Sequence, residues 1–512
     1  MDMRVAADAS GSEDEPWTLP EGWCWRTLDA LGTWTGGGTP SKANPAFWSG
    51  GSIPWVSPKD MKVDVIGDTE DRITEAAVDN SSAKYVPQGT ILMVMRSGIL
   101  RHTFPVAVTD RTVTLNQDLR ALTPREGVNP TFVARYLKLA NKRVLEDCSK
   151  DGTTVNSIEV SALERLPVPL APLPEQRRIV ERIDALFAEI ADGEVALEAA
   201  RKGLETFRRA LLKAAVTGEL TRDWRETHKP AETGHDLLAR IRAERAATPA
   251  KGRGKSAVAT PTLDTSNLPD LPDGWVWATL DEVASSVRNG TSAAPRANQN
   301  QFQILRISAV RPMWVDETQI RYLSEDQAVD AKDAIVTTGD LLFTRYNGST
   351  DLVGVGALYS GVPRYYPDKI IRVRLDPAIQ DHAGFFELAV NTGSSRKHIA
   401  SNIKTTAGQQ GLSGESLKLT PIPIPPPNEA SEILKRVKQA MGSFSDCQTL
   451  LQGQAADASR LRQAILKSAF EGTLVPQDPA DEPAAKMLER LRQAVPKANP
   501  RRRGRGKAGH GG

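Results

Sequence analysis

The chain has 512 residues, 40% of them hydrophobic, and a formal net charge of +2 at pH 7, so it is long enough for roughly two to four domains with real cores. The near-neutral charge gives no overall bias toward nucleic acid, and the three widely spaced cysteines exclude a disulfide framework or a Cys-x-x-Cys metal site. No apolar run is long enough to span a membrane, so we expect a cytoplasmic protein.

The chain begins with an acidic leader, 1–16, that we expect to be disordered, and a repeated sequence follows it. LPEGWCWRTLD (19–29) returns as LPDGWVWATLD (271–281) with eight of eleven residues identical. The offset of 252 residues (271 minus 19) is nearly the interval at which the long helices described below recur. The repeating unit is therefore predicted to be a half-chain of roughly 250 residues.

Each half carries a body, 17–171 in the first and 268–427 in the second, that is rich in valine, isoleucine and turn residues. Apolar β-branched runs bounded by turn residues predict strands. Such runs lie at Gly89–Met95, Val106–Val108, Gly339–Arg345 and Ile370–Leu375. Both bodies are therefore predicted to be mixed α/β domains with an irregular sheet. Their loops differ far more than the segments around them, as expected of modules that bind different ligands in one kind of site.

The predicted loops of both bodies collect side chains suited to phosphate groups and base edges. Arginine forms paired hydrogen bonds with guanine, asparagine and glutamine do so with adenine, and lysine anchors the backbone. For any single residue a solvated loop group is the simpler interpretation, so the hypothesis depends on two matching clusters. The first cluster is Thr39, Ser41, Lys42, Lys59, Lys62, Arg96, Arg101, Lys150, Thr153 and Asn156. The second is Arg288, Asn289, Arg296, Asn298, Arg306, Arg311, Arg345, Asn347, Lys404, Gln409 and Gln410.

A long helix with a heptad repeat is predicted at 172–220 and again at 428–474. Its seam positions alternate in steps of four and three, and each recurs 254 residues later (433 minus 179) without an insertion. Each helix is expected to open at Glu175 or Glu429, after a proline-rich segment, and to end at a glycine. The apolar seam is predicted to contain Ile179, Ile183, Leu186, Ile190, Leu197, Leu204, Phe207, Leu211, Ile433, Val437, Phe444, Leu451, Leu461 and Ile465.

Small or polar residues also occupy seam positions, among them Gly193, Ala200 and Gln454. They favour a seam shared with close-packed partners over a maximally stable zipper. The nearest partner for each helix is the other copy, so we predict that the two pair within one chain. The simpler alternative is that the heptads only hold the chain together or make it dimerise.

A linker, 221–267, follows the first helix, and a tail, 475–512, follows the second. Both segments contain a basic tract, which is expected to be solvated and unstructured. Nonspecific contact between these tracts and phosphate groups is the alternative. Each segment is predicted to contain a short amphipathic helix, at 236–246 and 484–494, and then a basic tract, TPAKGRGKS (248–256) and ANPRRRGRGK (498–507).

The chain lacks the usual catalytic signatures. GGGTPSK (36–42) imitates a phosphate-binding loop but has no glycine before the lysine, and the six histidines stand apart without metal-ligand spacing. The sequence therefore favours binding over catalysis. Two other classes stay open: a single-chain methyltransferase or nuclease with unrecognised motifs, and a coiled-coil DNA-binding scaffold.

From about residue 19 to residue 474 the chain resembles the specificity subunit of type I restriction-modification systems. The resemblance is carried by the half-chain repeat and by three sequences: GGTPSKANPAFWSGGSIPWVSPKD (37–60), PLPEQRR (172–178) and LLKAAVTGEL (211–220). The second copy departs from the pattern at its helix start, where NEASE (428–432) stands in place of PEQRR.

This resemblance implies two target-recognition domains separated by two long antiparallel coiled-coil helices, with an internal pseudo-twofold repeat. Each domain would read one half of a bipartite site in double-stranded DNA, and the helices would set the unread spacer. The chain would be non-catalytic and would bind no cofactor or metal itself. Its partners would be two modification subunits and the restriction subunits, and no membrane would be involved. S-adenosylmethionine, ATP and Mg²⁺ are expected on those partner subunits.

Overall fold

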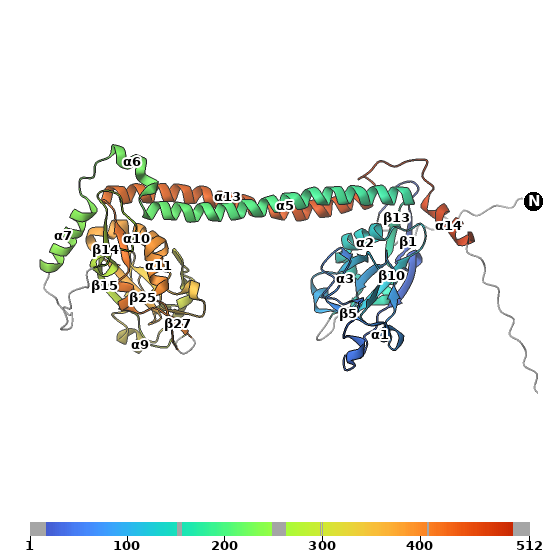
Figure 1. The fold of residues 1–512 in the computed structure, drawn as a ribbon, viewed down its shortest axis with the longest axis horizontal. Coiled ribbons are helices and arrows are strands. Elements are labelled where there is room, and N and C mark those ends of the chain that lie inside the picture. The colour runs from blue at the N-terminus through green and yellow to red at the C-terminus, as the bar shows by residue number, and fades with distance from the viewer. Residues whose placement is uncertain are drawn as a thin grey trace, which may run out of the picture. The chain divides into compact units, whose positions relative to one another are not determined.

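The computed structural model describes residues 17–150, 156–247, 263–296, 298–299, 301–406 and 409–494. They form two compact units: unit 1 contains the residues up to Leu197 and those from Gly453 onward, and unit 2 contains Glu198–Gln452. Figure 1 labels the long helices α5 and α13 and several of the other elements. The leader, Thr153 and both basic tracts lie outside the described residues. Within the described ranges, no helix combines the length and the apolar character that crossing a bilayer requires.

Unit 1 is built on two mixed sheets. The first has the order β2–β10–β7–β8–β4, with bounds Gly32–Gly36, Leu119–Pro124, Ile91–Val94, Val106–Thr109 and Val65–Ile66. The second has the order β5–β3–β9–β6, with bounds Asp71–Ile73, Ile53–Val56, Val113–Leu115 and Tyr85–Val86. Two short ribbons pair β1 (Cys24–Thr27) with β13 (Pro167–Leu170) and β11 (Ser149–Lys150) with β12 (Ser157–Ile158). Its shorter helices are α1 (Glu75–Asp79), α2 (Pro130–Leu139), α3 (Asn141–Asp147), α4 (Val160–Glu164) and α14 (Ala484–Ala494).

Unit 2 repeats this plan. Its first sheet has the order β15–β25–β21–β23, with bounds Ala284–Asn289, Ile370–Leu375, Leu341–Thr344 and Gly356–Leu358. Its second has the order β19–β16–β24–β20, with bounds Ile320–Tyr322, Gln303–Leu305, Arg364–Tyr365 and Ile335–Val336. Smaller sheets join β14 (Val276–Thr279) to β28 (Pro421–Ile424), β17 (Val310–Arg311) to β18 (Trp314–Val315), and β22 (Tyr346–Asn347) to β27 (Gln409–Gly411) and β26 (Lys404–Thr406). Its shorter helices are α6 (Arg222–Thr227), α7 (Gly234–Ala247), α8 (Leu280–Val283), α9 (Glu325–Asp330), α10 (Ala383–Asn391), α11 (Gly393–Ser401) and α12 (Gly414–Lys418).

The prediction of two mixed α/β domains in one chain is therefore confirmed. The proline-rich segments before the long helices, expected only as helix entries, are strands β13 and β28. Alternating prolines are tolerated there because each ribbon has only two strands, so the positions without an N–H face no neighbouring acceptor.

The first sheet of unit 1 has a fifth strand, β4, which pairs in parallel with β8. The equivalent edge of β23 in unit 2 is capped by other groups among the described residues. The Leu358 N–H donates to Glu387 Oε1 at 2.7 Å, and the Gly356 N–H donates to Asn391 Oδ1 at 3.1 Å. The Met313 N–H donates to the Gly356 carbonyl at 3.0 Å. Two side chains of α10 and one backbone N–H of the β17–β18 turn thus satisfy backbone groups at the edge that β4 covers in unit 1.

This cap makes the stability of unit 2 depend on pH. Burial raises the pKa of Glu387 to about 7 from an ordinary value of 4.5, despite the hydrogen bond from Leu358 that lowers it. Because the folded pKa is the higher one, the contribution to stability is fully present below pH 4.5 and is lost as the pH rises through 7. We expect E387Q, which cannot ionise, to gain about 2 kcal/mol over the native chain between pH 5 and pH 8. Urea unfolding of both proteins at the two pH values tests this, and a difference that does not change with pH would contradict it.

Two helices of 44 residues each, α5 (Leu173–Val216) and α13 (Pro427–Phe470), form the predicted pair. Both begin two residues before the expected Glu175 and Glu429, because proline is tolerated in a first turn whose N–H groups have no intrahelical acceptor. Each helix is followed by a glycine with a positive φ, 72° at Gly218 and 75° at Gly472, which is the conformation that ends a helix.

The two long helices run antiparallel, because in each unit the start of one lies beside the end of the other. In unit 1, Arg462 of α13 donates from Nη2 to Glu194 Oε2 of α5 at 2.8 Å. In unit 2, the Arg208 guanidinium of α5 lies 5.9 Å from the centre of the Phe444 ring of α13. The helix ends also belong to the domain cores: Ile183 and Phe470 join the core of unit 1.

Two residues of the predicted seam lie outside it. Phe207 is 54% exposed and Leu461 is 52% exposed, so their assignment to a buried seam is wrong. Near its C-terminal end each helix packs on a domain core. The residues that are buried there repeat every 3.6 positions, the period of a straight helix on a core, and not every 3.5 positions as in a heptad seam. Leu212 and Leu466 are buried by this packing. The remaining seam residues are buried (Ile179, Ile183, Leu211, Ile433, Val437, Phe444, Ile465) or half-buried (Leu186, Ile190, Leu197, Leu204, Leu451).

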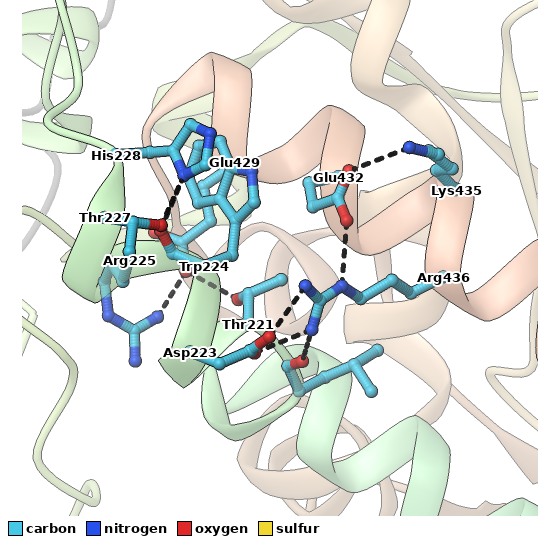
Figure 2. Close-up of polar contacts among 11 residues, drawn as sticks. Thr221, Asp223, Trp224, Arg225, Thr227, His228, Glu429, Glu432, Lys435 and Arg436 are labelled. Carbon is cyan, nitrogen blue, oxygen red and sulfur yellow. Dashed lines mark hydrogen bonds and ion pairs between the residues drawn. The ribbon is translucent and has the colours of Figure 1, made fainter.

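A polar network in unit 2 ties the start of α13 to the segment that follows α5, as Figure 2 shows. The Arg436 guanidinium donates to Asp223 Oδ1 at 2.7 Å and to Glu432 Oε1 at 2.8 Å. It also donates to the Leu220 carbonyl at 2.8 Å. One arginine therefore joins the two helix ends through three acceptors.

A buried glutamate anchors the start of each long helix to the tryptophan of the repeated LPxGW sequence. Trp275 Nε1 donates to Glu429 at 2.9 Å in unit 2, and Trp23 Nε1 donates to Glu175 at 3.0 Å in unit 1. The surroundings of the two carboxylates differ. Glu429 also accepts from Thr221 and from Arg225, whereas Glu175 Oε1 is buried without a partner among the described residues.

Candidate nucleic-acid interface

In unit 1 polar side chains that are distant in the sequence line a hollow of about 440 Å³. Lys42 follows β2, Lys59 follows β3 and Ser97 follows β7, so strands that are distant in the chain bring them to one place. Asn116, directly after β9, lines the same hollow, and buried Trp55 forms part of its wall. Lys42 and Lys59 were expected here from the sequence, whereas Ser97 and Asn116 were not. The signal that identifies Asn116 is its position directly after the apolar run Val113–Leu115.

The two lysines of this hollow are not equivalent. Lys59 Nζ lies 3.1 Å from Asp71 and 3.2 Å from Glu70, and hydrogen bonds to these carboxylates hold the pKa of Lys59 above its ordinary value. Lys42 forms no ion pair within the described ranges and is exposed. Of the two, Lys42 is therefore the cation available for an anionic ligand, while Lys59 organises the two acids.

The ribbon β11–β12 brings further predicted residues to this side of unit 1. Arg96 is bridged to Ser157 of β12, and the Ser97 N–H donates to the Asn156 carbonyl at 3.3 Å. Lys150 of β11 pairs with Glu159 at 3.3 Å. Arg96, Lys150 and Asn156 thus lie around one short ribbon beside the hollow.

The other candidates of unit 1 lie apart from that ribbon. The Thr39 hydroxyl is hydrogen-bonded to Gln117, and the Ser41 carbonyl accepts from Trp48 Nε1 at 3.1 Å. Lys62 and Arg101 are exposed, and neither lines the hollow.

In unit 2 the sheet β22–β27–β26 brings together the predicted residues Arg345, Asn347, Lys404, Gln409 and Gln410. Asn347 pairs with Gln410 in the antiparallel register, and Lys404 pairs with Gly411. The Arg345 guanidinium lies 4.8 Å from the centre of the Tyr346 ring and donates to the Asp368 carbonyl at 3.3 Å. Gln410 Oε1 is buried without a hydrogen-bond partner among the described residues, so this amide has an acceptor to offer.

Among the described residues, the remaining candidates of unit 2 share no strand pairing with that sheet. Arg288 and Asn289 end β15, and both are exposed. Arg296, Asn298 and Arg306 are exposed in loops, and Arg311 of β17 is half-buried opposite Trp314.

The two sites are built on the same backbone plan. In unit 1 the Ile158 N–H, next to β12, donates to the Met95 carbonyl at 2.8 Å. In unit 2 the Leu412 N–H, next to β27, donates to the Arg345 carbonyl at 2.9 Å. A short ribbon therefore attaches to the end of the central strand, β7 or β21, in both copies. Arg96 in the first ribbon and Tyr346 in the second are the equivalent pairing residues, so one plan carries different side chains.

Part of the chain matches a known family model, and curated specificity subunits resemble the chain. Residues 20–197 match the family model described as the type I restriction modification DNA specificity domain. The EcoKI specificity subunit of Escherichia coli K12 is 29% identical over 384 residues, which cover 72% of this chain and 73% of that protein. The EcoR124I/EcoR124II specificity subunit of Escherichia coli is 40% identical over 172 residues, 33% of this chain and 43% of that protein.

The fold is also shared with a solved chain from a study described as "Structural basis underlying complex assembly and conformational transition of the type I R-M system". That chain is 16% identical, with a TM-score of 0.61, and the match covers 90% of this chain and all of the other. Residues 20–197 thus carry a type I restriction modification DNA specificity domain, and the curated relatives of the chain are type I specificity subunits.

Proposed function

We propose that this chain is the DNA sequence-recognition subunit of a type I restriction-modification complex. Unit 1 and unit 2 each read one half of a bipartite site in double-stranded DNA. The helices α5 and α13 set the unread spacer and recruit the modification and restriction subunits. The chemistry belongs to those partners, with S-adenosylmethionine, ATP and Mg²⁺, because this chain carries no recognised catalytic motif.

The observation that carries this proposal is the pair of equivalent sites with different polar side chains. Reading two different half-sites requires the same approach to DNA and different donors and acceptors at the base edges. The ribbons at the ends of β7 and β21 meet both requirements, with Arg96 and Asn156 in one and Asn347 and Gln410 in the other. A coiled-coil scaffold would need no such divergence.

Within each site the side chains divide into anchors and readers. Lys42 and Lys404 form no ion pair in the described part of the chain, and we assign them to phosphates, which position a protein without specifying sequence. Asn347 and Gln410 in unit 2, and Asn156 in unit 1, are assigned to base edges. Gln410 is the strongest of these assignments because its buried acceptor is unpaired.

The experiment that tests the function is long-read mapping of methylated adenines in cells that express this chain with its modification subunit, against cells that lack the chain. A split motif with a fixed gap, absent without the chain, is expected. Methylation that is absent or unchanged would overturn the recognition role and favour the scaffold.

The same mapping tests the two sites separately. N347A combined with Q410A should relax one half-site by about 10–100-fold for each lost paired contact, equal to roughly 1–3 kcal/mol, and leave the other half-site intact. N156A should relax only the opposite half. As a control, K404A should weaken binding to all sequences alike and reduce its dependence on salt. A variant that relaxes both halves together would contradict the assignment of one half to each unit.

A further inference from the structure

Unit 2 contains a hollow of about 1020 Å³ that none of the candidate DNA-binding residues lines. It lies where the end of α5 meets the start of α11, the strand β28 and the segment before β14. Its wall is largely apolar, with Val216, Leu268 and Trp277, and its rim carries Lys213 and Lys397. It therefore belongs to neither of the sites described above.

The hollow exists because large side chains that occupy the same place in unit 1 are replaced by small ones. In unit 1 Trp17 Nε1 donates to the Phe470 carbonyl at 3.2 Å, and its ring packs edge-on against Trp25 at 4.9 Å. The space left between Trp17, Tyr136 and the end of α13 is about 260 Å³. By the offsets of the repeat, Phe470 corresponds to Val216 and Trp17 to Pro269, and both of these line the larger hollow. A site that holds an aromatic side chain in unit 1 is thus open in unit 2.

The rim of the open hollow also has the cationic charge that is neutralised in unit 1. There Lys467 of α13 pairs with Glu471, one helical turn later, at 3.8 Å. The equivalent pair in α5 is Lys213 and Thr217, so the carboxylate is missing. Among the described residues neither Lys213 nor Lys397 forms an ion pair, and Asp264, the one acid lining the hollow, accepts from the Ser266 N–H at 3.0 Å.

A buried polar atom at this hollow also lacks a partner. His398 lines it, and its Nε2 is buried without a hydrogen bond among the described residues. Such an atom is costly unless a bound group satisfies it. Together with an apolar wall and a cationic rim, it specifies a ligand that has an aromatic body and acidic flanks.

We propose that this hollow is a docking site for an acidic segment with an aromatic side chain, supplied by a partner protein. The chain's own sequence contains such a segment, in which Glu13, Asp14 and Glu15 precede Trp17, and Trp17 lines the smaller hollow of unit 1. The aromatic ring would pack on Val216 and Trp277, and the acids would face the two lysines. The chain's own linker, 248–262, has the opposite composition, with three basic residues, no acid and no aromatic, so it does not match the rim.

The test uses the full-length chain and a fluorescently labelled peptide, SGSEDEPWTL, with the sequence of residues 10–19. Anisotropy titration should show binding that falls at least tenfold when the peptide tryptophan is replaced by alanine or its acids by their amides. K213E combined with K397E on the chain should also cost at least tenfold. V216F should weaken binding by filling the hollow, and because Val216 is buried, the two surface lysines provide the decisive variant.

The matched control is K467E, which changes the equivalent lysine in unit 1 and should leave peptide binding unchanged. Loss of binding in K467E alone, or no binding to the native chain, would overturn the proposal. If K213E with K397E lowers affinity for DNA but not for the peptide, the lysines contact phosphate, and the proposal fails. Methylation motifs measured on the same variants keep the two hypotheses apart, since a lost peptide site with unchanged half-sites supports docking alone.

Discussion

Replacing Glu429 with glutamine should lower the stability of unit 2 by about 2–3 kcal/mol, because it removes one partner of a buried ion pair. Glu429 is fully buried and accepts from Trp275, from the Thr221 hydroxyl at 2.7 Å and from Arg225. A glutamine keeps the tryptophan bond but presents an NH₂ group to donors. It also removes the counter-charge of Arg225, whose side chain is only 19% exposed.

The same change at Glu175 in unit 1 is the matched control and should cost less than about 1 kcal/mol. Glu175 is 2% exposed and has one partner, Trp23, while its other oxygen has none among the described residues. Burial raises the pKa of Glu175, although the bond from Trp23 lowers it in part. The carboxylate therefore destabilises the fold increasingly as the pH rises above its unfolded value, so E175Q should do relatively better at pH 8 than at pH 5.

Hydrogen exchange read by mass spectrometry measures both variants at the strands beside the two tryptophans. E429Q should speed exchange in β14 and β28 by about 30–100-fold, the equivalent of 2–3 kcal/mol, and leave β1 and β13 unchanged. E175Q should change β1 little. Equal losses in the two units would show that the extra partners of Glu429 contribute nothing.

The sequence predicted the long helices well because their signal is local and periodic. The heptad steps placed α5 at 172–220, against Leu173–Val216 in the structure. The same pattern does not show whether the opposite helix or the domain core buries a given position, because one apolar face of each helix packs against both. Phe207 and Leu461 were misassigned for that reason, and both are more than half exposed.

The candidate sites were predictable only in part, because they depend on pairing between distant strands. Asn347 and Gln410 are partners through the register of β22 and β27, which no local pattern states. Neutralisation of Lys59 by Glu70 and Asp71 likewise follows from where β5 lies beside β3. Residue type indicated which side chains suit DNA, and the fold determined which of them meet.

The second large effect is expected from shortening both long helices by one heptad. We expect deletion of 197–203 together with 452–458 to shorten the spacer of the methylated motif by about three base pairs and to leave both half-sites unchanged. Seven residues remove about 10 Å of helix, and each base pair spans about 3.4 Å. The deleted stretches are exposed except for half-buried Leu197, Glu198 and Ala458, so little core is lost.

The geometry of the two polymers explains why methylation should also become slower. Seven residues fall only about 20° short of two full helical turns, so the apolar stripe continues nearly unbroken. Three base pairs, however, turn DNA by about 100°, because one turn takes about 10.5 base pairs. The shortened helices therefore fit the shorter distance between the two half-sites, but they do not reproduce the change of about 100° in the rotation of one half-site relative to the other. Deleting the heptad from only one helix breaks the shared seam and should abolish a defined motif. A spacer that stays the same in the double deletion would mean that the helices do not set it, and an altered half-site would mean that reading and spacing are not separate properties of this chain.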